Sequence, residues 1–210
     1  MSIHVTSLSV GPWPMNCYLV GDEASRAAWV VDPGGDVERI RAALADGGWR
    51  LEAILQTHGH LDHVVGTAEL RAAAGVPVLA YPDDAPLFAD ERLREFGGEP
   101  FVPDRWVRDG ETLTLGATTF EVLHVPGHTP GHVAYVGGGA CLSGDVIFRI
   151  GSGRTDLPGG DMRALERSLA RLLALPDDTT IYPGHGPTAT VGYVRQFNPY
   201  VPELRIEDRG

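Results

Sequence analysis

Histidines and a carboxylate crowd into one short stretch of the chain. Residues 57–63 read THGHLDH, which places three imidazoles and one carboxylate close together. Crowded histidines repel one another when they are charged, and they need hydrogen-bond partners when they are buried. A cation removes both problems, because neutral imidazole and carboxylate are good ligands for a zinc-like ion. The segment therefore predicts a metal site, and a polar cluster without metal is the alternative.

Three later places in the chain offer further ligands. The candidates are His128 in PGHTPGH, Asp145 in SGD and His185 in PGHG. Each of them follows an apolar run and lies beside glycine or proline, where a strand passes into a loop. Taken alone each motif is weak, because a Gly-His or Gly-Asp pair is usually only a turn. Open α/β sheets bind ligands at the ends of their strands, so four such ends predict one shared site.

The elements that must position these residues alternate along the chain. Short apolar runs predict strands at 3–10, 17–21, 27–31, 52–57, 76–80, 111–115, 118–125, 132–136, 140–143 and 179–182. Amphipathic stretches predict helices at 36–46, 63–74, 84–95, 161–174 and 188–197, with Asp161 as the N-cap of the fourth. No low-complexity linker divides the sequence, and the short segment 97–104 is the best boundary candidate. We therefore expect a single domain over 1–210 that contains two sheets.

Composition narrows the class of protein. The 210 residues carry a formal charge of −11, which argues against a general nucleic-acid binder. No apolar run approaches the roughly 18 residues that a membrane-spanning helix needs, and the N-terminus lacks the pattern of a secretory signal. Cys17 and Cys141 are far apart in sequence and are expected to be reduced thiols. We therefore expect a cytoplasmic protein with neither nucleic-acid nor membrane partners.

The histidine and aspartate motifs occur in an order that resembles a known family. HxHxDH, PGHTPGH, SGD and PGH follow one another as they do in the metallo-β-lactamase superfamily. The stretch SGDVIFRIGSGRTDLPGGD resembles most closely glyoxalase II and its short bacterial relatives, and the similarity runs from NCYLV to PGHGPTATV. The resemblance implies an α/β fold, the αβ/βα four-layer sandwich, in which two mixed sheets face each other and the helices lie outside.

The resemblance also implies a centre with two divalent ions, with zinc as the first expectation and iron or manganese as alternatives. The implied ligands are His58, His60 and His128 for one ion, Asp62, His63 and His185 for the other, and Asp145 as the bridge between them. A hydroxide that bridges the two ions would be the nucleophile, because bound cations acidify water. Asp62 and Asp145 are the carboxylates expected to be catalytic.

Four further residues have expected roles beside the ligands. The resemblance implies that Asp32 steadies the ligand loops, and a plain Asp-Pro-Gly turn is the alternative. Thr57 is expected to act in the same way, and His132 is expected to make a supporting hydrogen bond rather than to ligate. Arg154 is a candidate to face an anionic substrate, and an exposed loop arginine is the alternative.

The resemblance implies a metal-dependent hydrolase that acts on a small thioester of the S-lactoylglutathione type. Longer glyoxalases II carry a C-terminal helical region for glutathione, which we do not expect here. The resemblance also implies that Pro187 and Asp156 stand where tyrosines would contact that thiol. A persulfide dioxygenase with one iron on the same scaffold is the alternative, and a non-catalytic binding module is a third reading. We expect a monomer or a small homo-oligomer.

Overall fold

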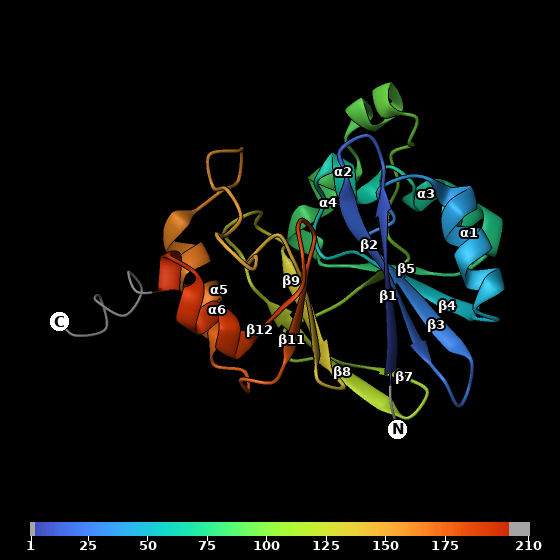
Figure 1. Cartoon of the computed structure of the whole chain (residues 1–210). Helices are drawn as coiled ribbons and strands as arrows, with labels where there is room; N and C mark the ends of the chain where they lie inside the picture. The colour runs from blue at the N-terminus through green and yellow to red at the C-terminus, as the bar shows by residue number, and fades with distance from the viewer. Residues whose placement is uncertain (1–2, 202–210) are drawn as a thin grey trace.

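Two six-stranded sheets face each other in the computed structural model, which describes residues 3–201 (Figure 1). Across the first sheet the order is β1 (Ile3–Val10), β2 (Met15–Asp22), β3 (Ala27–Val31), β4 (Arg50–Leu55), β5 (Val78–Ala80) and β6 (Arg105–Trp106). Across the second the order is β12 (Ala189–Thr190), β11 (Thr180–Pro183), β10 (Ala140–Gly144), β9 (Val133–Gly137), β8 (Thr118–His124) and β7 (Thr112–Leu115). Each sheet contains both parallel and antiparallel pairs, which confirms the expected mixed sheets.

Helices and 3-10 turns alternate with the strands along the described chain. They are α1 (Val37–Asp46), α2 (Leu61–Val64), α3 (Thr67–Ala74), the 3-10 turn η1 (Pro82–Asp84), α4 (Ala85–Phe88), the 3-10 helix η2 (Glu91–Phe96), α5 (Met162–Leu173) and α6 (Val191–Phe197). Asp161 caps α5 as expected, because its side chain accepts a hydrogen bond from the Ala164 N–H at 3.0 Å.

Alternation of apolar side chains along the strands creates the layers. On β3, Ala28 and Val30 belong to the apolar cluster under α1 and α3, while Trp29 and Val31 belong to the cluster between the two sheets. Successive side chains of a strand point to opposite faces, so a strand that is apolar throughout is buried on both. A third cluster joins the second sheet to α5 and α6. The structure thus confirms the αβ/βα four-layer sandwich (Figure 1).

The structure corrects the helix expected over 63–74. The chain forms two helices instead, α2 and α3, which are interrupted at Gly66. The Gly66 N–H donates to the Pro33 carbonyl at 2.9 Å, and a Cβ at Gly66 would come within 2.7 Å of that oxygen. A contact with a distant loop therefore breaks a helix that periodicity alone predicts to be continuous.

Two other expected helices also differ. The expected helix 84–95 is divided into the end of η1, α4 and η2, because the chain turns at Asp90, whose side chain accepts from the Arg92 N–H at 2.9 Å. The expected helix 188–197 begins only at Val191, after Ala189 and Thr190 have paired with β11. The short strands β6 and β12 were not expected, because two residues are too few to form a periodic pattern.

Strand direction decides where the loops meet. β3 and β4 run parallel, so their carboxyl ends lie at one edge of the first sheet. β8 and β10 are each antiparallel to β9, and β11 is parallel to β10, so β8, β10 and β11 also end at one edge. The loops that carry the expected ligands leave the sheets at these edges.

The described residues bear on two features, membrane-spanning helices and the two cysteines. Over residues 3–201, no helix is long and apolar enough to cross a membrane. Cys17 and Cys141 are both buried and free, so the two thiols are not joined in a disulfide.

Candidate metal centre

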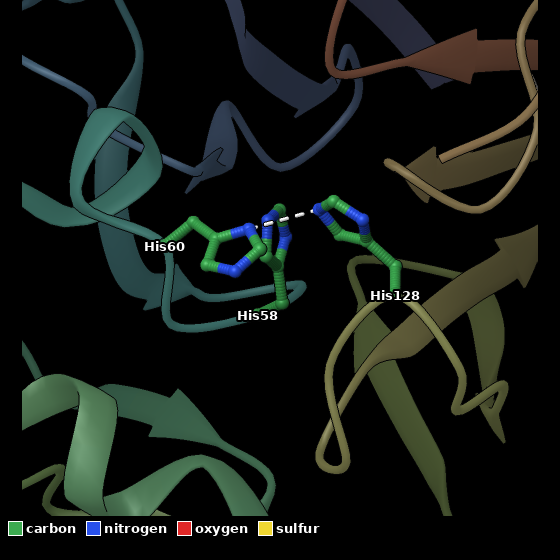
Figure 2. Close-up of side chains that lie close together, drawn as sticks. All are labelled: His58, His60 and His128. Carbon is green, nitrogen blue, oxygen red and sulfur yellow. Dashed lines mark hydrogen bonds between the residues drawn. The ribbon is translucent and has the colours of Figure 1, made fainter. Parts of the chain in front are cut away.

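Three imidazoles from two loops converge in what we call site one, formed by His58, His60 and His128. His58 and His60 belong to the loop after β4, and His128 belongs to the loop after β8. One ring nitrogen from each lies within 4.8 Å of the others, and His60 Nδ1 is 2.9 Å from His128 Nε2. Figure 2 shows the three rings turned toward one another from opposite sides of the gap between the loops. This geometry can hold one cation.

A second group, which we call site two, consists of Asp62, His63 and His185. Asp62 and His63 lie in α2, directly after the loop of site one, and His185 follows β11. Ligand atoms of the three residues lie within 4.8 Å of one another, and His185 Nε2 is 3.1 Å from Asp62 Oδ2. Site two therefore differs from site one by containing a carboxylate.

The carboxylate of Asp145, just after β10, lies between the two sites. Its Oδ1 is 3.6 Å from His63 Nε2, and its Oδ2 is 3.7 Å from His128 Nε2 and 3.6 Å from His185 Nε2. One carboxylate thus faces a histidine of site one and two histidines of site two. That is the position a bridging ligand requires.

Buried polar atoms show that these residues fit metal ions. Five buried side-chain atoms of the described residues lack a hydrogen-bond partner, and three of them are His58 Nε2, His63 Nε2 and Asp145 Oδ1. Leaving a buried polar atom unpaired costs about 1–3 kcal/mol, so three such atoms at one place need an explanation. Imidazole nitrogen and carboxylate oxygen are the donors that zinc-like ions prefer. Bound cations would satisfy all three.

Asp32 holds His63 directly and His58 through the Thr57 hydroxyl. Its Oδ2 accepts hydrogen bonds from His63 Nδ1 at 3.0 Å and from the Thr57 hydroxyl at 2.6 Å, and its Oδ1 accepts from the Thr57 N–H at 2.7 Å. Because the Thr57 hydroxyl donates to Asp32, it accepts from His58 Nδ1 at 3.0 Å. Both histidines therefore keep Nε2 free to ligate. Asp32 also lies within 4.8 Å of their ligand atoms, but these bonds occupy its oxygens.

His128 and His132 are held by backbone groups. His128 Nδ1 donates to the Arg154 carbonyl at 2.7 Å, which leaves its Nε2 facing site one. His132 Nε2 accepts from the Asp145 N–H at 3.0 Å, and its ring stacks on His58 with centroids 4.6 Å apart. His132 lies outside both ligand groups and accepts a hydrogen bond from the backbone of Asp145.

The Arg154 side chain does not contact the two sites through any described interaction. Its guanidinium is exposed and donates to both carboxylate oxygens of Asp156 at 2.6 Å. That ion pair lowers the pKa of Asp156 to about 2. The role of Arg154 toward a substrate stays a prediction.

Burial sets the protonation of site one. Removal from water lowers the pKa of His58 well below its usual value, and the neighbouring imidazoles lower it further. The same two causes lower the pKa of His60 to about 4, and burial also lowers the pKa of His128. These histidines are therefore neutral near pH 7, the form that binds metal.

Carboxylates set the protonation of site two. The hydrogen bond to Asp62 raises the pKa of His185. Burial opposes the charge of His63, but Asp145 and Asp32 outweigh it and raise the pKa of His63 well above the usual range. Burial likewise opposes ionisation of Asp62 and Asp145, and nearby histidines still lower both pKa values. Site two therefore favours protonated histidines more than site one does.

Two residues of β2, which no motif in the sequence marks, hold the loop of His185. Asn16 Nδ2 donates to the carbonyls of Pro183 at 2.9 Å and Gly186 at 2.8 Å, and the Tyr18 hydroxyl donates to Pro183 at 2.7 Å. These bonds tie β2 to the loop of His185. Asn16 and Tyr18 lie in NCYLV, which carries the family resemblance, but nothing in that segment indicates a polar contact with a loop so far along the chain. No motif marks Asp84 either, although its carboxylate accepts hydrogen bonds from both loops of site one.

The chain is similar over most of its length to several known proteins. The chain is 38% identical over 209 residues to the hydroxyacylglutathione hydrolase GloC of Haemophilus influenzae, and the match covers 95% of this chain and 98% of that protein. The crystal structure of TTHA1623 in a di-iron-bound form is 40% identical, with a TM-score of 0.84 over 93% of this chain and 99% of that one. ETHE1 from Myxococcus xanthus is 28% identical, with a TM-score of 0.82 over 98% and 90% of the two chains.

A family model assigns most of the chain. The model described as the metallo-β-lactamase superfamily matches residues 10–185, which include every expected ligand. The match is consistent with the fold, with the histidine and aspartate groups and with the similarity to a named hydrolase. The chain belongs to the metallo-β-lactamase superfamily.

Proposed function

We propose that the chain is a hydrolase with two divalent ions that cleaves a small thioester of the S-lactoylglutathione type. The observation that carries this proposal is the position of Asp145, whose two oxygens face two complete groups of ligands. The similarity to a protein named hydroxyacylglutathione hydrolase supports the substrate class. The di-iron form of a similar structure supports a count of two ions.

The proposed division of labour follows from the contacts. Site one and site two would each hold one ion, with zinc as the proposed metal and iron or manganese as alternatives. When bound, the ions would polarise the thioester carbonyl and acidify the attacking water. Asp145 would hold the two sites at a fixed separation. Asp62 would hold His185, and Asp32 would hold His63 with its Nε2 turned to the centre.

The cysteines do not suit a covalent mechanism. Burial raises the pKa of Cys17 well above its usual value and raises the pKa of Cys141 to about 12. A thiol attacks as its thiolate, so both are poor nucleophiles. Hydrolysis would then add water across the C–S bond directly and release a carboxylic acid and a thiol.

Recognition of the substrate is a separate part of the proposal. We place an anionic end of the thioester near Arg154, whose guanidinium would exchange Asp156 for the substrate. Pro187 and Asp156 replace tyrosines that the family resemblance implies, so we expect looser selection of the thiol. A cytoplasmic location and a monomer or small homo-oligomer stay predictions.

A persulfide dioxygenase is the second candidate, and the likeness to ETHE1 favours it. That reaction would use one iron, held by His58, His128 and Asp145. Two histidines and one carboxylate with open positions suit oxygen chemistry at iron. His185 separates the candidates, because it belongs to site two and is not needed by the single-iron site.

The test is the variant His185→Ala, with His4→Ala as the control. His4 is an exposed imidazole that stacks on Trp49 away from both sites. We expect His185→Ala to lose one metal equivalent together with most hydrolysis of S-lactoylglutathione, and His4→Ala to match the parent. Intact single-iron content with retained oxygen uptake on a persulfide would overturn the hydrolase and support the dioxygenase.

A further inference from the structure

Asp84 is a fully buried carboxylate that belongs to neither ligand group. It lies where η1 meets α4 in the first half of the chain, and its exposed fraction is 0%. Its Oδ2 accepts hydrogen bonds from the Gly59 N–H at 2.9 Å and the Thr129 hydroxyl at 2.7 Å. Its Oδ1 accepts from the Gly131 N–H at 2.6 Å. Three donors therefore converge on one carboxylate.

The three donors come from the two loops that build site one. Gly59 lies between His58 and His60, and Thr129 directly follows His128. The first loop leaves the first sheet and the second loop leaves the second sheet. Asp84 thus joins loops from the two sheets, through residues that are neighbours of the three histidines in sequence.

We propose that Asp84 is a positioning residue, which sets the spacing between the two loops and thereby the metal affinity of site one. The proposal rests on the metal centre proposed above. Asp84 would not itself be a metal ligand, and it would affect the metal affinity of site one but not of site two. A charged acceptor with two oxygens suits the task, because charge-assisted hydrogen bonds are short and strong.

Close packing shows that the loops are fitted to this carboxylate. A Cβ at Gly131 would lie 2.4 Å from the Asp84 nitrogen and 2.8 Å from its Oδ1. A Cβ at Gly59 would lie 2.5 Å from the Cβ of Leu87, in the helix that follows Asp84. Each loop therefore presents a glycine where it meets the Asp84 turn. The 2.9 Å contact between His60 and His128 spans the same two loops, so a change in their spacing would reach the ligands.

The experiment compares Asp84→Asn and Thr129→Val with the control Asp83→Asn. An asparagine keeps one acceptor oxygen, so its amide N–H would face one of the three donors. Thr129→Val removes a single donor and keeps the shape of the side chain. Asp83 is exposed and adjacent, so its variant makes the same change in charge without touching the loops. The readout is a Co²⁺ titration of the folded, metal-stripped protein, together with the visible spectrum of the cobalt form and urea unfolding.

We expect Asp84→Asn to weaken binding at site one by roughly 10–100-fold, the usual effect of changing a group that supports metal ligands. Thr129→Val should weaken it by roughly fivefold, as the loss of one hydrogen bond implies. The cobalt spectrum of site one should shift in Asp84→Asn, while site two and Asp83→Asn match the parent. A role in folding alone would lower the stability to urea and leave affinity and spectrum unchanged.

Parent affinity and parent spectrum at site one in folded Asp84→Asn would overturn the inference. If Asp84→Asn does not fold, the Thr129→Val variant tests the inference instead. Parent metal affinity at site one in Thr129→Val would then overturn the inference. A parent chain that binds two cobalt ions with the expected response to Asp84→Asn, yet hydrolyses no thioester, would refute the proposed substrate and support this inference. A parent chain that binds no cobalt would refute both.

Discussion

Sites one and two share a centre but differ in charge. Burial makes the three histidines of site one neutral, with the pKa of His60 lowered to about 4. Site two contains the carboxylate of Asp62, and the carboxylates around it raise the pKa values of His63 and His185. Site one is therefore prepared to accept a cation without releasing protons. The raised pKa values of His63 and His185 mean that protons would compete more strongly with a cation at site two.

The two sites also differ in what holds them. Site one depends on contacts between the loops after β4 and β8, which meet at Asp84. In site two, His63 is held by Asp32, and the loop of His185 is held by Asn16 on β2. We therefore expect that each site can be weakened separately at these supports, although Asp145 faces both sites and Asp32 supports one histidine of each.

Asp145→Ala should have the largest effect. This variant removes a charge that faces histidines of both sites, so both metal equivalents should bind more weakly than after the loss of any single histidine. Hydrolysis should fall to background. Metal titration checks the prediction, with Asp178→Ala as an exposed aspartate control before β11. Two equivalents bound as tightly as in the parent would show that Asp145 is not the bridge.

His58→Ala should abolish activity through site one. His58 lies on a loop beyond β4, so the sheets and helices should remain formed, and far-ultraviolet circular dichroism should match the parent. Elemental analysis should show the loss of metal from site one. Normal turnover with full metal content in this variant would reject His58 as a ligand.

Asn16→Ala should weaken site two alone. The variant removes the amide that donates to the carbonyls on both sides of the His185 loop. We expect roughly tenfold weaker binding at site two and unchanged binding at site one, as is typical of residues that support ligands. Ser7→Ala is the control, because Ser7 contacts Asn16 and not the loop. Equally weakened metal binding at both sites would contradict the claim that Asn16 supports site two alone.

Acidification should have the smallest effect, and it should fall on site two. The pKa of His185 is raised, so its protonated form competes with metal as the pH falls through the neutral range. The pKa of His60 is lowered to about 4, so site one meets no such competition until far lower pH. Metal titrations at pH 8, 7 and 6 should show a decline at site two first. An equal loss of metal affinity at both sites would show that the two sites do not differ in charge in this way.

The fold could be predicted from the sequence, and candidate ligands could be named, but the residues that support them could not. The candidate ligands stand in short motifs at the ends of apolar runs, and the order of those motifs carries the family resemblance. Asp84 is different, because its partners lie 25 to 47 positions away and its own surroundings, PDDAPLF, indicate only the start of a helix. Asn16 bonds residues 167 and 170 positions away. The break at Gly66 depends on Pro33. Hydrogen bonds between residues far apart in sequence form only when the chain folds, so no local sequence pattern predicts them.

The number of metal ions per chain tests the central claim most directly. The protein is purified without added metal, its metals are measured by elemental analysis, and its active fraction is determined on the same sample. Two complete ligand groups joined by Asp145 predict two ions per active chain. A fully active hydrolase with one ion per chain would contradict the account.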